Sequence, residues 1–200
     1  MTQPTHIPHP WHGLSVGDDA PDVVNTYIEM TPSDAVKYEL DKQSGLLKVD
    51  RPRQLSSQLP TIYGFIPRTF CGDRVGQLSD TVEDGDHDPL DVCVISERPI
   101  DRSQILLTAR IVGGLHMVDG GEADDKIIAI IEGDRIWGDV DDISGVPEAI
   151  VEKLRHYFLT YKMFPGDTTA EVSIDEAYGA DHAKTVLRAA IDDYDERFET

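Results

Sequence analysis

The chain has 200 residues and carries 18 Lys and Arg residues against 38 Asp and Glu residues, a formal net charge of −20. This length suits one domain with a substantial core, and the acidity argues against a general nucleic-acid binder, which would show a basic patch. No apolar run is long enough to cross a bilayer, and no basic start followed by an apolar block marks a secretory signal. Cys71 and Cys93 do not form a C-x-x-C pair, so we expect a cytoplasmic protein with reduced thiols.

The first 20 residues are rich in Pro, His and Gly and show no period, and we expect a flexible arm before a single domain over residues 21–200. Alternating apolar residues predict a strand that begins at Val23 and ends before Pro32. The short, Gly-terminated connection 41–45 predicts a hairpin between two following strands. The predicted strands after the first are 36–40, 46–49, 62–66, 90–95, 104–112, 115–118 and 127–131.

The pattern then changes to helical spacing. Pro147 stands at a helix start, and apolar residues recur at three- and four-residue intervals until the chain reaches Pro165. A short strand at 169–174 precedes a last helix at 180–198, and the aperiodic stretch 70–83 predicts a loop. Many strands followed by two amphipathic helices predict an α+β fold with a closed or partly closed β-barrel core.

The stretch 83–94 concentrates negative charge at the entry to a strand. Pro89 stiffens its centre, and the β-branched run from Val92 follows without a spacer. A solvated acidic loop is the ordinary interpretation of such a run, but a rigid acidic turn on a buried strand favours a hard cation such as Mg²⁺ or Mn²⁺. An EF-hand loop is excluded, because Pro89 replaces its Gly and Ile95 its terminal Glu. The carboxylates are Glu83, Asp84, Asp86, Asp88 and Asp91.

A second acidic cluster, residues 119–126, also lies between strand-like runs and around a Gly-Gly pair. Alone it indicates an ordinary hairpin loop; facing the first cluster across a cleft, it would share several divalent ions with it. Lys and Arg residues are scarce, so their positions in the sequence are informative. Each is nevertheless compatible with an ordinary surface charge. Lys162 is also compatible with a charge that complements a helix C-terminal dipole. The cations beside these elements are Lys37, Arg51, Lys126 and Lys162.

Together these residues resemble the soluble family I inorganic pyrophosphatases. The stretch 86–92, Asp-His-Asp-Pro-Leu-Asp-Val, is similar to the family signature Asp-x-Asp-Pro-[apolar]-Asp-[apolar]. The other elements follow in the family's order over residues 24–165: Glu29, Lys37-Tyr38-Glu39, Asp50-Arg51, Tyr63-Gly64-Phe65-Ile66, Asp119 with Asp124 and Lys126, and Tyr161-Lys162. The resemblance implies a five-stranded, oligonucleotide-binding-type (OB-like) closed barrel with two main helices outside, which hydrolyses pyrophosphate to two phosphates in a homo-oligomer, a hexamer or a dimer.

The resemblance also implies roles. Asp88 is the expected general base, and Tyr63 is expected to orient the nucleophile. Several Mg²⁺ ions are implied, with Mn²⁺ or Zn²⁺ substituting and Ca²⁺ inhibiting. Their expected ligands are Asp86, Asp91, Asp119, Asp124, Glu29 and Glu39, and the expected phosphate-binding residues are Lys37, Arg51, Lys126, Tyr161 and Lys162.

The chain departs from the family pattern at three places. Leu59 stands where well-known bacterial members have a Tyr, Gly120 replaces an acid, and the loop 68–84 is longer than in compact bacterial enzymes. Three alternatives remain beside the pyrophosphatase: a catalytically inactive metal-binding or interaction protein on the same barrel, an oligonucleotide-binding barrel with stacked aromatics, and a hydrolase of another phosphoanhydride.

Overall fold

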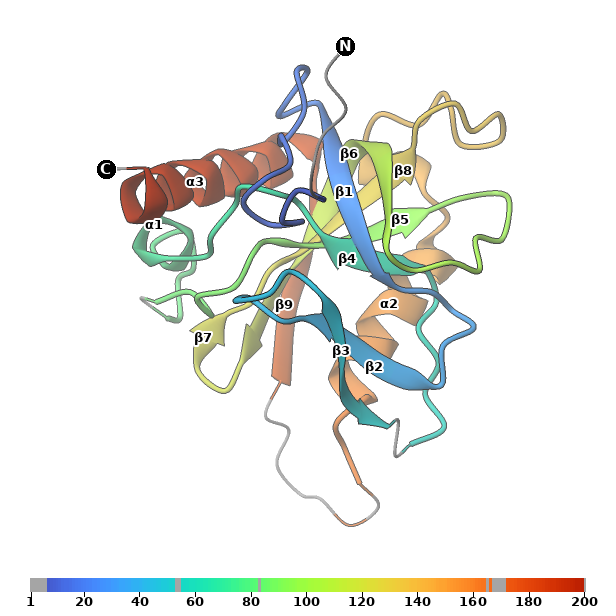
Figure 1. The fold of residues 1–200 in the computed structure, drawn as a ribbon. Coiled ribbons are helices and arrows are strands. Elements are labelled where there is room, and N and C mark those ends of the chain that lie inside the picture. The colour runs from blue at the N-terminus through green and yellow to red at the C-terminus, as the bar shows by residue number, and fades with distance from the viewer. Residues whose placement is uncertain (1–6, 53–54, 83, 165, 167–171, 200) are drawn as a thin grey trace.

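The computed structural model describes residues 7–52, 55–82, 84–164, 166 and 172–199. Over these residues the chain forms a mixed seven-stranded sheet, a separate two-stranded sheet and three α-helices (Figure 1), which confirms the predicted α+β class. The strands are β1 (Val23–Met30), β2 (Val36–Leu40), β3 (Leu47–Pro52), β4 (Ile62–Phe65), β5 (Asp91–Ile95), β6 (Ile105–Asp119), β7 (Glu122–Ala123), β8 (Lys126–Ile131) and β9 (Val172–Gly179). The helices are α1 (Asp73–Gly76), α2 (Glu148–Thr160) and α3 (Ala180–Phe198), with a 3₁₀ turn at Ile143–Gly145.

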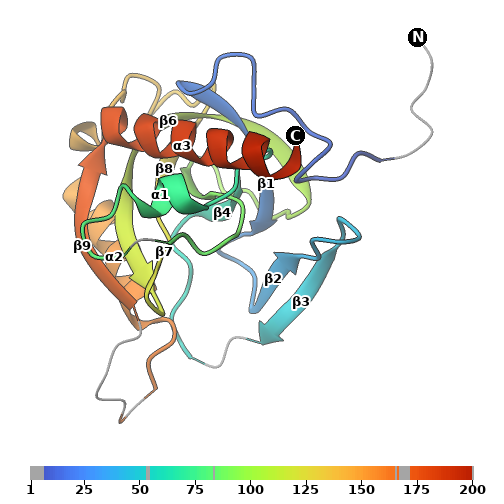
Figure 2. The same cartoon turned by 90° about the vertical axis from the view of Figure 1, so that its left-hand side faces the viewer.

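Five strands pair in a ring. Antiparallel ladders join β1 to β4, β4 to β5, β8 to β6 and β6 back to β1, and one parallel ladder joins β5 to β8. Strands β7 and β9 add to β6, whereas the β2–β3 hairpin lies beside the ring (Figure 2). Successive residues of a strand face opposite sides, and in β5 both sides are buried: Val92 and Val94 join one core cluster and Cys93 another.

The two long helices close the core on different sides. The buried side of α3 packs into the cluster that contains Val92, with Val186 and Leu187 at its centre. The buried side of α2 packs into the cluster that contains Cys93, through Leu154 and Phe158. No helix among the described residues is both long and apolar enough to cross a membrane.

Strand β6 is longer than expected. The sequence predicts two strands, 104–112 and 115–118, because Gly113 and Gly114 interrupt the apolar pattern. That prediction is wrong: the pair lies inside one strand. A Cβ at Gly113 would stand 2.5 Å from the Tyr178 carbonyl oxygen, and one at Gly114 2.4 Å from the Tyr178 ring. The glycines therefore admit the close approach of β9, which is a role that Gly has inside strands.

Four smaller expectations have their own outcomes. The strand predicted at 169–174 overlaps β9, which continues to Gly179, and residues 169–171 lie outside the described part of the chain. The helix predicted from Pro147 begins at Glu148, and the loop 70–83 contains the short helix α1. Part of the predicted arm packs on the domain: Trp11 is buried, and its indole N–H donates to the Thr69 carbonyl at 2.7 Å.

Candidate active site

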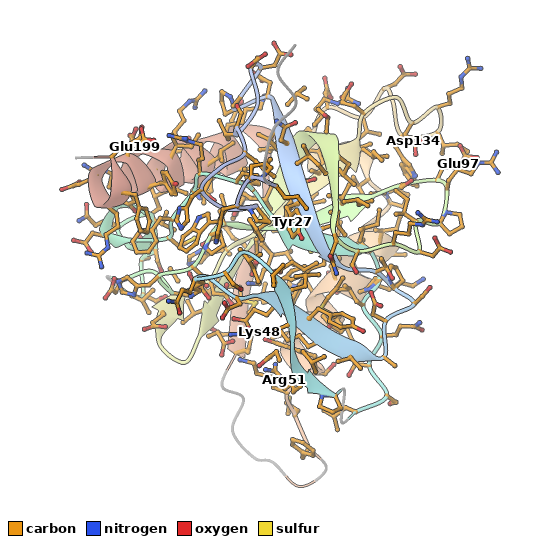
Figure 3. All side chains as sticks on the ribbon, in the orientation of Figure 1. Tyr27, Lys48, Arg51, Glu97, Asp134 and Glu199 are labelled. Carbon is orange, nitrogen blue, oxygen red and sulfur yellow. The ribbon has the colours of Figure 1, made fainter. Side chains whose placement is uncertain are left out.

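One cavity of about 1060 Å³ opens at the end of the strand ring. Every residue expected at the site, apart from Glu29 and Glu39, lines it. Its charged lining residues come from four parts of the chain: the β2–β3 hairpin, the acidic turn 84–90 that leads into β5 with Asp91 at the start of that strand, the β6–β8 connection, and the segment at the C-terminal end of α2. The side chains of Arg51 and Lys48 show where the hairpin lies in front of the ring (Figure 3).

The parallel pairing of β5 and β8 places opposite charges together. Asp91 and Lys126 are the first residues of these strands and are Cα partners in the ladder. The Lys126 Nζ lies 2.5 Å from Asp91 Oδ2, contacts Asp124, and is only 3% exposed. Burial lowers the pKa of Lys126, but the carboxylates of Asp124 and Asp91 outweigh it and raise the pKa well above its usual value. Lys126 is therefore a fixed cation in the cavity wall.

The carboxylates exceed the positive charge around them. Burial, followed by the charge of Asp124, raises the pKa of Asp86 to about 9. Burial also raises the pKa of Asp91, although Lys126 opposes the shift. A carboxyl group whose pKa is raised this far by burial and by neighbouring carboxylates indicates a site short of cations.

A hydrogen bond to Asp91 positions Tyr63. Its hydroxyl donates to Asp91 Oδ2 at 2.5 Å, the same oxygen that Lys126 approaches. Burial, together with the charge of Asp91, raises the pKa of Tyr63 well above its usual value, so its phenol remains protonated. Tyr63 is thus a neutral donor in the wall between β4 and β5.

The far wall carries the remaining cations. Lys162 follows the end of α2 and contacts Asp119, the last residue of β6. On the hairpin, Lys37 and Arg51 are cross-strand partners, and both approach Asp50, the Lys37 ammonium at 3.3 Å and the Arg51 guanidinium at 2.6 Å. These cations thus surround the cavity from opposite sides, each restrained by a carboxylate.

Two expected metal ligands lie off the cavity wall. Glu29, on β1, is 6% exposed, and its Oε1 accepts a hydrogen bond from the Leu40 amide at 2.7 Å. Burial, and then the charge of Asp91, raise the pKa of Glu29 to about 8. Glu39 lies 3.7 Å from the Lys37 ammonium. In this structure both glutamates support the hairpin and its lysine.

One lysine that contacts the site was not predicted from the sequence. Lys42, in the β2–β3 turn, contacts Asp88 Oδ1. Its position within a predicted hairpin turn was visible, but nothing in the spacing indicates that the turn reaches the acidic stretch. Glu122 also lines the cavity and was not expected there.

The two substitutions noted in the sequence have structural counterparts. Gly120 has φ 62° and Gly121 φ 94° in the turn between β6 and β7, a conformation that glycine adopts without strain. Leu59 is 2% exposed and lines the cavity. An apolar side chain therefore occupies part of the cavity wall.

The donor set suits a hard divalent ion. The side chains of the two acidic clusters that line the cavity offer only carboxylate oxygens, the ligands that Mg²⁺ and Mn²⁺ prefer. Over the described residues, no three Asp, Glu, His or Cys side chains already converge on one ion-sized point; lysine ammonium groups lie between the carboxylates instead. A cation that replaced the proton on Asp86 would relieve its raised pKa.

Comparison with known proteins shows the family of this chain. The family model described as inorganic pyrophosphatase matches residues 26–195. An inorganic pyrophosphatase of Chlamydia muridarum is 46% identical over 201 residues, 96% of each chain, and a soluble inorganic pyrophosphatase of Zea mays is 38% identical over 93% of this chain and 79% of its own. The crystal structure of the Thermus thermophilus inorganic pyrophosphatase superposes with a TM-score of 0.79 at 32% identity, covering 93% of this chain and 98% of that one.

Proposed function

This chain belongs to the inorganic pyrophosphatase family and is a hydrolase, and we propose that it splits pyrophosphate into two phosphates in a Mg²⁺-dependent reaction. The observation that carries the proposal is the composition of the cavity wall: carboxylates on the acidic turn and the β6–β8 connection face the cations of the hairpin and of α2. A substrate with four negative charges needs both divalent ions and fixed cations to enter so acidic a protein.

Asp86, Asp91, Asp119 and Asp124 are the proposed ligands of the ions, with Glu29 and Glu39 at a further position. When bound, Mg²⁺ lowers the pKa of a coordinated water and neutralises phosphate oxygens. Neither Glu29 nor Glu39 lines the cavity, so this further position lies beside the cavity wall.

Asp88 is the proposed general base. Its carboxylate lines the cavity and is 37% exposed, which leaves it accessible to an attacking water. As the water oxygen bonds to one phosphorus, Asp88 takes the proton and the bond from that phosphorus to the bridging oxygen breaks. The water's second proton stays on the product phosphate. Tyr63, which remains a protonated donor, orients the nucleophile side of the cavity through Asp91.

Lys37, Arg51, Lys126, Tyr161 and Lys162 are the proposed phosphate-binding residues. Arg51 and Lys37 lie side by side on the hairpin, and Lys162 stands across the cavity at the end of α2. Cations on both sides of the scissile bond neutralise the charge that develops on the leaving phosphate and on the phosphate under attack. No covalent intermediate is needed.

We also propose the organisation around this site. The ring of five paired strands supports a closed OB-like barrel, and the family match over residues 26–195 supports one catalytic domain over residues 21–200. Cys71 and Cys93 are free and buried, which suits reduced thiols in the cytoplasm. Exposed apolar side chains on the hairpin and β6, among them Leu46 and Leu106, suit a homo-oligomer.

The test is phosphate release by the purified protein from pyrophosphate with Mg²⁺, with Ca²⁺ and with excess chelator, and from ATP in parallel. Rapid Mg²⁺-dependent release from pyrophosphate, suppressed by Ca²⁺ and slow on ATP, is the expected result. Faster release from ATP would favour a hydrolase of another phosphoanhydride. Release from neither substrate with any metal would favour an inactive protein on the same fold.

A further inference from the structure

A buried carboxylate on the last helix organises the loop beside the acidic turn. Asp193, on α3, is 5% exposed. Its Oδ2 accepts hydrogen bonds from the backbone N–H groups of Gly72 and Arg74, each at 3.1 Å, and of Val75 at 3.2 Å. Its Oδ1 accepts from the Arg74 guanidinium at 3.0 Å. A carboxylate with this many donors holds the start of α1 on α3.

Cys71, which precedes Gly72, pairs with the acidic turn 84–90. The Cys71 N–H donates to the Asp88 carbonyl at 2.8 Å, and the His87 N–H donates to the Cys71 carbonyl at 3.0 Å. A Cβ at Gly85 would stand 2.3 Å from the Cys71 carbonyl oxygen. The Cys71 backbone therefore contacts the acidic turn at Gly85, His87 and Asp88, and only glycine fits at position 85.

The turn itself is held in an unusual conformation between two backbones. His87 has φ 60°, a value uncommon for a residue with a side chain, and it separates Asp86 from Asp88. On the side away from Cys71, the Asp86 N–H donates to the Ala123 carbonyl at 3.2 Å. The spacing of Asp86 and Asp88 thus depends on the backbone contacts that Cys71 and Ala123 make with the turn.

We propose that Asp193 is a positioning residue of the active site: through Gly72 and Cys71 it holds Asp86 and Asp88 in register for metal binding and proton transfer. The inference rests on the proposed function and assigns a role to residues 71–75 of the long loop, which carry the contact from α3 to the turn. Reacting groups need placement to within about 0.5 Å, and a displacement of about 1 Å costs roughly 100-fold in rate.

The variant Asp193→Asn tests this inference. The amide has nearly the shape of the carboxylate, but in either orientation its NH₂ group faces donors, the backbone N–H groups or the Arg74 guanidinium. Its matched control is Asp192→Asn, an exposed neighbour on the same helix with the same change in charge. Gly85→Ala disturbs the same contact from the turn side, and it keeps the test informative where Asp193→Asn does not fold.

Two measurements separate positioning from plain stability. At a temperature where circular dichroism shows each variant folded, we expect Asp193→Asn and Gly85→Ala to lower kcat by 10- to 100-fold and to raise the half-activating Mg²⁺ concentration several-fold. The KM for pyrophosphate should change less than twofold, because Lys37, Arg51 and Lys162 lie on the hairpin and at the end of α2. In a thermal melt without substrate, the rise in Tm that Mg²⁺ produces in the unaltered protein should shrink at least by half in both variants and persist in Asp192→Asn.

A lowered Tm with unchanged kcat, Mg²⁺ activation and Mg²⁺-dependent Tm shift would show that Asp193 only stabilises the loop, and would overturn the inference. An equal loss in Asp192→Asn would also overturn it. Failure of the unaltered protein to hydrolyse pyrophosphate would reject the proposed function. In that case, comparing the Mg²⁺-dependent Tm shift of the unaltered protein with that of the two variants would still test whether Asp193 positions the turn. If Mg²⁺ does not raise the Tm of the unaltered protein, the inference is overturned as well.

Discussion

The ammonium group of Lys42 contacts Oδ1 of Asp88, although the two residues lie in separate turns of the chain. A side-chain hydrogen bond supports the β2–β3 turn that carries Lys42: Asp41 Oδ2 accepts from the Ser44 N–H at 2.9 Å. The turn is also attached to the N-terminal segment, since His9 Nε2 lies 3.2 Å from the Lys42 carbonyl oxygen. The hairpin therefore brings a cation to the proposed general base.

Removal of this cation should reduce turnover moderately. Lys42→Met leaves the Asp88 carboxylate without its partner, and an ion pair this exposed is worth about 1 kcal/mol or less, so we expect kcat to fall by up to roughly fivefold. Steady-state kinetics with pyrophosphate measure this effect. Lys48→Met is the control, because it removes a lysine of the same hairpin whose ammonium lies 3.9 Å from Asp41. Equal losses in both variants would point to a general charge effect of the hairpin.

Asp88→Asn should preserve the fold and Mg²⁺ binding while lowering kcat by about 10²- to 10⁴-fold, the range expected for loss of a general base. The measurement is kcat at saturating Mg²⁺ with circular dichroism as a check on folding. Asp84→Asn provides the comparison: it removes a carboxylate from the same turn that is 55% exposed and does not line the cavity. Turnover of Asp88→Asn close to that of the unaltered protein would remove Asp88 from the mechanism.

Arg51→Ala and Lys37→Ala should each weaken the handling of pyrophosphate, because the two cations lie side by side on the hairpin wall of the cavity. A hydrogen bond to a charged group is worth about 1.5–3 kcal/mol, so kcat/KM should fall by roughly 10- to 150-fold. Lys48→Ala, an exposed position on the same hairpin, should leave kcat/KM near its original value. A full kcat/KM in both cavity variants would place the phosphate site elsewhere.

The stability of the protein should depend on pH through His12. Burial, followed by the nearby charges of His9 and Arg68, lowers the pKa of His12 below its usual 6.5, so the unfolded chain takes up this proton first. The contribution of His12 is therefore fully present above pH 6.5 and is lost as the pH falls through the lowered folded pKa.

Thermal melts between pH 7.5 and pH 5 of the unaltered protein and of His12→Gln measure this contribution. The variant loses the ring that packs on Trp11 and hydrogen-bonds Tyr194, so its Tm should be lower at pH 7.5. The gap between the two proteins should narrow towards pH 5. A gap that widens on acidification would mean that the protonated ring is the stabilising form.

The sequence indicated the local parts of this protein well. The last helix is confirmed as Ala180–Phe198. In the first hairpin the strand Val36–Leu40 is confirmed, and the strand predicted at 46–49 is observed at Leu47–Pro52. Residue spacing and turn residues indicate which face of an element is buried. The stretch 86–91 indicated the candidate site for a similar reason: its carboxylates and proline adjoin the strand in the sequence, so the pattern can be recognised without the fold.

Only the tertiary structure decided which distant groups complete the site. Glu29 lies behind the wall rather than in it, Lys42 reaches Asp88 across the hairpin, and Gly113 stays within one strand because Tyr178 packs against it. The Asp193 carboxylate binds backbone N–H groups more than a hundred residues earlier in the chain. A backbone N–H is the same in almost every residue, so such a contact leaves no pattern of residue types in the sequence, and it exists only once packing brings α3 against the loop.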